Sequence, residues 1–424
     1  MLKEFRIKNF NSIKKEILFT MEPELNAVSE YPEHLWGNTH GDKLLKVASI
    51  YGPNAGGKTT LIKAIYLLQY LFRERYEFDE RNERLLGRTS RFYIEPFKFV
   101  DIIDNLLSST IIFIDDKYEL GYSYELEHKS TREEHKFVIV TESLSYRKLG
   151  TQVNESVFER NGNIVEAKGL LSELFLPKIN VSDTQLLLSH LNINYINSFS
   201  GNKHYSDIVF RLINQVDKLV LYDNTYLAPI YQRIDVLDKK EEFKKWVLET
   251  VNSLGINISN IYIEKINDHS RAIYVVHKIN DKEFKLRWEH ESEGTKQLIL
   301  LLLSIYHRLH LGGILLVDEI DAHLHPKLIS KIIQIFTSKL NINTQLIFNS
   351  HDIMNMTNEL FRRDEIWFMY RDENLNSELV SLSDFIDYKG DRIRKDAKYS
   401  KQYMEGKYGA DPFVAKGVLW NGEN

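Results

Sequence analysis

VASIYGPNAGGKTTLIKAI, residues 47–65, is the stretch from which the organisation of this chain follows. A short apolar strand leads into a glycine-rich turn, and a helix begins near Lys58. The spacing Gly-x-x-x-x-Gly-Lys-Thr in this context is typical of a loop whose backbone N–H groups surround phosphate oxygens. Lys58 is expected to reach the β and γ phosphates, and Thr59 to ligate Mg2+. The other residues expected to contact the nucleotide are Asn54, Gly57 and Thr60.

The composition favours a cytoplasmic protein. With 424 residues the chain can form two or three domains with a large core. It has no cysteine, which excludes disulfides, thiolate metal sites and thiol catalysis. The 55 basic and 60 acidic residues give a net charge of -5, so no overall positive field indicates nucleic acid as a partner. No apolar run approaches the roughly 18 residues of a membrane span, and we expect no membrane attachment.

Residue periodicity predicts an α/β fold in which strands and helices occupy different parts of the chain. Residues 2–8 and several β-branched or aromatic runs between Phe97 and Arg147 favour an antiparallel sheet, beginning with a strand at Phe97–Val100. Residues 238–254 carry apolar side chains on one helical face. We expect residues 1–160 and 257–424 to form the two parts of one nucleotide-binding domain, and residues 161–256 a mainly helical insertion.

A second group of polar residues follows two apolar strands. The run 311–317 ends in Asp318 and Glu319, and the run 345–350 is followed by His351. The carboxyl ends of parallel strands lie at the mouth of a sheet, where α/β folds bind ligands. Asp318 is therefore the expected second Mg2+ ligand, and Glu319 the residue that orients or deprotonates an attacking water. His351 is placed to bond the γ-phosphate or that water, with a surface or capping role as the alternative.

The segment Glu291-Ser-Glu-Gly-Thr-Lys-Gln-Leu298 lies just ahead of an apolar helix that runs to about His310. Ser292 at the N-cap, with free N–H groups in the first helical turn, forms an anion site. For an isolated sequence of this kind, a capping motif alone is the better explanation.

The order of these motifs resembles that of the ABC-class ATPases, a group that includes the SMC and RecF proteins. Residues 292–295 are similar to the signature motif, residues 318–319 to Walker B and His351 to the switch histidine. The opening FRIKNFNSI, residues 5–13, is similar to the first strand of the SMC and RecF branch. The compact combination most resembles the AAA-15 and OLD-like ATPases of bacterial antiphage defence, such as the ATPase subunits of PARIS, Septu, retron-linked and abortive-infection systems.

The resemblance implies an ABC-type ATPase head that binds ATP and Mg2+ and hydrolyses ATP, with Glu319 and His351 as catalytic residues. It also implies at least a homodimer, in which Ser292 and Gly294 of one subunit close over the nucleotide of the other. The trigger is expected to be infection, and the effector a separately encoded protein such as a Toprim or HNH nuclease. The chain departs from the pattern at Glu293, where transporters carry glycine, and at His325, which replaces the D-loop aspartate.

Other functions remain open at this point. A stand-alone DNA-repair ATPase of the RecF type would need a local basic surface, for which Lys389–Lys407 is the best segment. The large strand-rich insertion argues against a transporter subunit. A zinc site built from His310, His323 and His325, and a nuclease-type cluster of acidic residues at 318, 319 and 321, are weaker alternatives because the Walker B strand explains both neighbourhoods.

Overall fold

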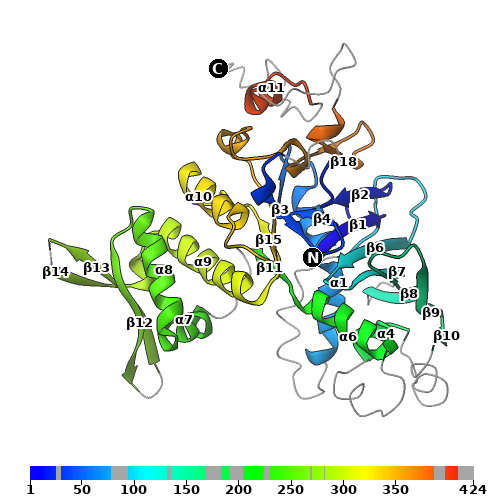
Figure 1. Cartoon of the computed structure of the whole chain (residues 1–424), viewed down its shortest axis with the longest axis horizontal. Coiled ribbons are helices and arrows are strands. Elements are labelled where there is room, and N and C mark those ends of the chain that lie inside the picture. The colour runs from blue at the N-terminus through cyan, green and yellow to red at the C-terminus, as the bar shows by residue number, and fades with distance from the viewer. Residues whose placement is uncertain are drawn as a thin grey trace, which may run out of the picture.

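The computed structural model describes residues 1–24, 30–77, 94–130, 135–168, 183–190, 204–223, 230–267, 270–280, 282–385 and 397–408. Two large sheets lie on either side of the helix α1 (Lys58–Glu77), and more helices and a small sheet cover the far face of the second sheet (Figure 1). The predicted α/β class, with a phosphate-loop sheet, flanking helices and an antiparallel subdomain, is confirmed. Most of the arginine-rich run 73–91, and residues 389–396 of the basic segment 389–407, lie outside the described residues.

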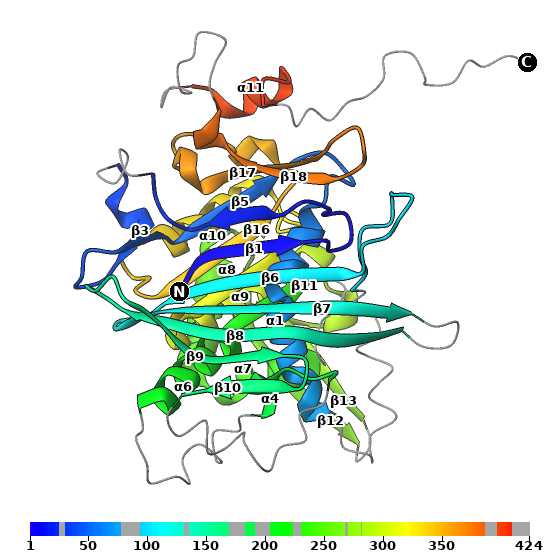
Figure 2. The same ribbon diagram turned by 90° about the vertical axis from the view of Figure 1, so that its right-hand side faces the viewer.

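The first sheet is antiparallel throughout its described part and faces the viewer in Figure 2, with the strand order β10-β9-β8-β7-β6-β1-β2. The prediction of a strand at Phe97–Val100 is wrong. The Phe97 N–H donates to the side chain of Asn9 rather than to a neighbouring strand, and Phe99 is exposed. The strands are β1 (Leu2–Lys8), β2 (Ile17–Thr20), β6 (Leu106–Ile114), β7 (Tyr118–Ser130), β8 (His135–Lys148), β9 (Asn154–Asn161) and β10 (Ile164–Ala167).

The second sheet carries the phosphate loop, and its described strands have the order β11-β15-β16-β5-β17-β18. The first five run parallel, so their carboxyl ends share one edge, and only β18 is antiparallel. β11 lies within the segment expected to be mainly helical. Its run LVLYD is short and apolar, and it pairs in parallel with β15 as the edge strand of the sheet. The strands are β5 (Val47–Tyr51), β11 (Leu219–Asp223), β15 (Gly313–Asp318), β16 (Thr344–Asn349), β17 (Ile366–Arg371) and β18 (Ser377–Ser381).

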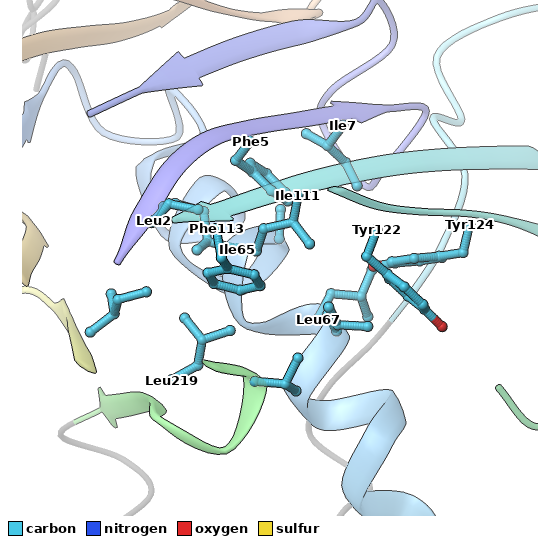
Figure 3. Packing of buried hydrophobic residues seen from close by; sticks show 14 of the residues in the cluster. Leu2, Phe5, Ile7, Ile65, Leu67, Ile111, Phe113, Tyr122, Tyr124 and Leu219 are labelled. Carbon is cyan, nitrogen blue, oxygen red and sulfur yellow. The ribbon is translucent and has the colours of Figure 1, made fainter. Parts of the chain in front are cut away.

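α1 is buried on more than one face because it lies between the two sheets. Its residues Ile65 and Leu67 belong to the same apolar cluster as Phe5 of β1 and Phe113 of β6 (Figure 3). Side chains of the parallel strands alternate between two cores. In β15, Ile314 and Leu316 face the α1 cluster, and Leu315 and Val317 face the opposite cluster. A strand covered on both faces is continuously apolar, which is why 314–317 could be recognised in the sequence.

The opposite cluster contains α9 (Glu293–Leu311), α10 (Pro326–Thr337) and the pair α7 (Ile230–Lys239) and α8 (Glu241–Ser253). The predicted amphipathic face of α8 is confirmed, since Phe243, Val247 and Val251 are buried. These helices carry a small antiparallel sheet of β12 (Ile258–Asn267), β13 (Ser270–Ile279) and β14 (Lys282–Arg287), at the left of Figure 1. Further elements are the helix α6 (His204–Asp217) and the short segments β3 (Leu35–Gly37), β4 (Lys43–Leu45), α4 (Leu187–His190) and α11 (Tyr399–Met404).

One buried side chain joins the two large sheets directly. Gln345 of β16 donates from Nε2 to the carbonyl oxygens of Leu2 (2.9 Å) and Leu45 (3.0 Å), and its Oε1 accepts the Leu2 N–H at 2.7 Å. Gln345 is fully buried, so water cannot replace these hydrogen bonds, and the loss of any one would leave a buried polar group unpaired. None of the helices in the described ranges combines the length and apolar character needed to cross a membrane.

Candidate functional site

The turn between β5 and α1 packs tightly against the neighbouring strand β17. Gly52 has φ 146°, and a Cβ there would overlap the carbonyl oxygen of Met369. A Cβ on Gly56 would approach the same oxygen to 2.6 Å. Glycine is therefore required by close backbone contact as well as by conformation. The loop forms one wall of a cavity of about 210 Å³ lined by residues 54–60, Glu319, Asn349, His351 and Arg371.

The Lys58 side chain bonds to the backbone of this loop. Its Nζ donates to the carbonyl oxygens of Gly52 at 2.8 Å and Pro53 at 2.9 Å. Only 6% of the residue is exposed, and this burial lowers the pKa of Lys58 to about 8, against the opposing attraction of Asp321 and the Walker B carboxylates. A buried ammonium whose charge is disfavoured by burial gains from an incoming phosphate anion.

Thr59 and Asp318 meet at the predicted metal position. The Thr59 hydroxyl donates to Asp318 Oδ1 at 2.9 Å, although the two residues come from α1 and the end of β15. The Asn349 amide donates to the same carboxylate oxygen at 2.6 Å, and its own oxygen accepts the N–H of Glu319. Glu319 has φ 54°, a left-handed conformation that non-glycine residues adopt rarely and mostly at functional sites. Asn349 therefore fixes both Walker B residues.

His351 follows β16 and lines the cavity, as does Glu319. The backbone N–H of His351 donates to Asp321 Oδ2 at 3.1 Å, which connects the turn after β15 to the turn after β16. Two other histidines of this region, His325 and His310, have structural partners. His325 caps α10 by accepting the Lys327 N–H, and His310 bonds the carbonyl oxygen of Tyr306.

The cavity thus brings together most of the residues predicted from the sequence: Asn54, Gly57, Lys58, Thr59, Thr60, Glu319 and His351, with Asp318 bonded to Thr59. Ser292 and Gly294 are not among the residues that line it. Ser292 is the N-cap of α9, as predicted, and its Oγ accepts the Thr295 N–H at 3.1 Å. A Cβ on Gly294 would lie 2.8 Å from the carbonyl oxygen of His323, so α9 begins against the turn that follows Walker B.

Outside the phosphate loop, sequence reasoning missed two residues that line the cavity, Asn349 and Arg371. Asn349 is the last residue of β16, so the strand-end argument that selected His351 applied to it equally. Arg371 ends β17, and no local motif marks it. Its place beside the loop follows from the pairing of β17 with β5, which puts Phe368 opposite Tyr51.

The chemistry of these groups fits a nucleotide with Mg2+. Amides of the glycine turn, Lys58 and Arg371 are donors for phosphate oxygens. The bonded pair of Thr59 and Asp318 offers one hydroxyl and one carboxylate oxygen, and Mg2+ is commonly held by one or two carboxylates together with substrate phosphates and waters. In the described part of the chain, no group of three or more histidine or acidic side chains is placed to hold a metal by itself. An Mg2+ site that phosphate oxygens complete does not need three such side chains.

The parallel sheet, the glycine turn that opens α1 and the polar residues at the strand ends define a domain of the P-loop ATPase class. Residues 47–355 match the model of the family described as "AAA domain, putative AbiEii toxin, Type IV TA system". The match covers more than half of the chain, and the chain belongs to this family. The family match confirms the predicted resemblance to P-loop ATPases. No curated protein matches the chain.

Among solved structures, the SMC head domain from Thermotoga maritima is similar over 90% of this chain and 98% of that chain, with 14% identity and a TM-score of 0.41. The SmcHead bound to the C-winged helix domain of ScpA is similar over 90% and 97%, with 14% identity and a TM-score of 0.41. The Smc head with an extended coiled coil bound to the C-terminal domain of ScpA, derived from Pyrococcus furiosus, is similar over 90% and 96%, with 13% identity and a TM-score of 0.40.

Proposed function

We propose that this protein is an ATPase whose cavity binds ATP with Mg2+ and hydrolyses it to ADP and phosphate. Lys58 and the loop amides hold the phosphates, and Thr59 and Asp318 are the protein ligands of the metal, which when bound neutralises phosphate charge. Glu319 accepts a proton from the water that attacks the γ-phosphorus, and the bond to the β-phosphate oxygen breaks. His351 donates to the γ-phosphate or positions that water. The gathering of these groups around one cavity supports the proposal.

The active form is a head-to-tail homodimer with two composite sites. The single observation that carries this step is that Ser292 and Gly294 do not line the cavity that contains the P-loop. The cavity, at about 210 Å³, is smaller than the roughly 300–1,000 Å³ of typical ligand pockets, so it suits a phosphate chain better than a whole nucleotide. Ser292 and the first turn of α9 from a second copy supply further donors for the γ-phosphate.

ATP binding and hydrolysis then act as a switch. ATP favours the closed dimer only by binding it more tightly than the open one, and hydrolysis removes the γ-phosphate on which that difference depends. We propose that infection biases this equilibrium in the bacterial cytoplasm, and that a separately encoded toxic effector, such as a Toprim or HNH nuclease, responds to it. The family description, which names an AbiEii toxin and a type IV toxin–antitoxin system, supports a role in such defence systems.

Two substitutions test the enzymatic part. Lys58→Ala is expected to abolish nucleotide binding, measured by titration calorimetry with ATP and Mg2+. Glu319→Gln is expected to bind ATP but to hydrolyse it at least about a hundredfold more slowly, since general bases contribute about that much. It should also elute as a dimer with ATP and as a smaller species with ADP in size-exclusion chromatography. Wild-type turnover by Glu319→Gln would show that Glu319 is not the base.

The defence role needs a test in cells. Bacteria that carry the gene with its neighbouring reading frames are challenged with a panel of phages, and the wild type is compared with Lys58→Ala. Fewer plaques with the wild type alone support the proposal, and equal plaque numbers for every phage argue against it. DNA-stimulated, salt-sensitive turnover of the purified protein would instead favour a DNA-repair ATPase of the RecF type.

A further inference from the structure

Arg371 occupies a flank of the phosphate cavity that the P-loop motifs do not account for. It ends β17 and lines the cavity together with the loop. In the sheet, β17 adjoins β5 on one side, whereas β16 and β15 lie on the other. Glu319 follows β15 and His351 follows β16, so both lie toward the opposite flank of the loop from Arg371.

The Arg371 side chain is partly buried beside the loop. Its Nε is buried and has no hydrogen-bond acceptor, and the guanidinium forms no ion pair with any residue that the structure describes. Other partly buried arginines are paired: Arg147 contacts Glu119 at 2.7 Å, and Arg211 contacts Asp115 at 2.6 Å. Burial of a donor that lacks an acceptor is unfavourable, so the free energy of this site falls when an anion enters.

The acidic residue next in sequence does not fill this place. The Asp372 carboxylate accepts the backbone N–H groups of Asn374 and Asn376, each at 2.9 Å, and lies 4.0 Å from Lys15. The Walker B carboxylate of Asp318 accepts the Thr59 hydroxyl at 2.9 Å, and Glu319 lines the cavity beside His351. The flank formed by β17 is therefore the cationic side of the cavity.

We propose that Arg371 is a nucleotide-binding residue whose guanidinium donates hydrogen bonds to a phosphate that is not transferred, the α- or β-phosphate. The inference rests on the proposed function, because it assumes that ATP occupies this cavity. Glu319 and His351 are the groups for the γ-phosphate, and they lie away from β17. A planar guanidinium can donate two parallel hydrogen bonds to phosphate oxygens, which makes arginine well suited to this position.

This position of the contact predicts how Arg371 affects the affinities for ATP and for ADP. A contact with a phosphate that remains in ADP strengthens ATP and ADP binding by the same factor. It acts equally before and after bond cleavage, so its loss raises KM and leaves kcat unchanged. A charge-assisted hydrogen bond is worth a factor of about ten or more in affinity.

The test compares the full-length wild type with Arg371→Ala, and with Lys282→Ala as a control that removes an exposed cation on β14. Titration calorimetry measures the affinities for ATP, ADP and inorganic tripolyphosphate, each with Mg2+, and steady-state kinetics give kcat and KM. We expect Arg371→Ala to weaken all three ligands about tenfold or more at unchanged kcat, and Lys282→Ala to behave as the wild type. If Arg371→Ala does not fold, judged by circular dichroism, Arg371→Gln takes its place, with the same expectation.

The outcomes separate this inference from the proposed function. A wild type that binds no ATP contradicts both. A wild type that binds ATP while the Arg371 variants bind it equally well contradicts the inference alone. Weaker binding of ATP with unchanged ADP affinity would place the contact on the γ-phosphate, and unchanged tripolyphosphate affinity would place it on the base or ribose. Either result overturns the assignment to a retained phosphate.

Discussion

Replacement of Asn349 by leucine tests whether one buried amide organises the Walker B turn. The side chain is 1% exposed and has two partners, the Asp318 carboxylate at 2.6 Å and the backbone N–H of Glu319. Leucine has a similar shape but neither donates nor accepts. A hydrogen bond to a charged group contributes about 1.5–3 kcal/mol, and an N–H left buried without a partner costs about 1–3 kcal/mol. We expect the free energy of unfolding to fall by about 3–5 kcal/mol.

The same change should also slow hydrolysis, because Glu319 depends on this bond for its backbone conformation. At φ 54° the residue occupies a region that costs about 1–3 kcal/mol and persists only where neighbouring contacts enforce it. Relaxation of the turn moves the carboxylate away from the γ-phosphate. A loss of about 1.4 kcal/mol in transition-state stabilisation already corresponds to a tenfold lower kcat. We therefore expect Asn349→Leu to reduce kcat at least about tenfold.

Urea unfolding and steady-state ATPase assays measure the two effects, and Gln345→Leu is the matched control. Gln345 is a fully buried amide on the same strand, but its partners are Leu2 and Leu45, at the joint between the two sheets. This control should lose comparable stability and keep the wild-type kcat per folded molecule. If both variants lose kcat equally, general destabilisation explains the effect. Wild-type kcat in Asn349→Leu would refute the proposed control of Glu319.

Three further changes have definite expected outcomes. Burial lowers the pKa of Lys58 to about 8, so in the free protein the side chain is charged below that pH and neutral above it. The affinity for ATP should therefore fall up to about tenfold for each pH unit between pH 8 and 10. An affinity that does not change with pH, measured by calorimetry, would contradict this. Gly52→Ala forces a Cβ onto the Met369 carbonyl and should lower the unfolding free energy by several kcal/mol and abolish ATP binding, measured by urea unfolding and calorimetry. His277→Ala removes the 2.7 Å contact from β13 to Glu291, the residue before the signature serine. It should lower kcat a few fold and leave the nucleotide affinity of the P-loop unchanged. A kcat equal to that of the wild type would show that the contact has no role in turnover.

Local patterns predicted the elements whose residues decide their own conformation. The opening strand at residues 2–8, the buried strand ending at Asp318 and the N-cap at Ser292 were all recognisable, because alternation, apolar runs and capping residues act over a few positions. Phe97–Val100 had an equally good pattern and is not a strand, since its N–H partner is a side chain from β1's following turn. β11 was missed because an apolar run of five residues among helices gives no sign of which sheet it joins.

The same distinction, between residues marked by a local pattern and residues placed by the tertiary structure, applies to the site. Residues that follow β15 and β16 could be grouped from the sequence because parallel strands bring their carboxyl ends to one edge, whatever their order in the sheet. Arg371 could not, because its position depends on β17 pairing with the outer side of β5, and sheet order is a tertiary property. The cavity has carboxylates on one flank and, on the other, a guanidinium whose Nε has no acceptor among the described residues, so under the proposed function it is polarised along the phosphate chain. In the proposed homodimer, that polarity leaves the signature motif of a second subunit one place to act, at the γ-phosphate end, where ATP differs from ADP.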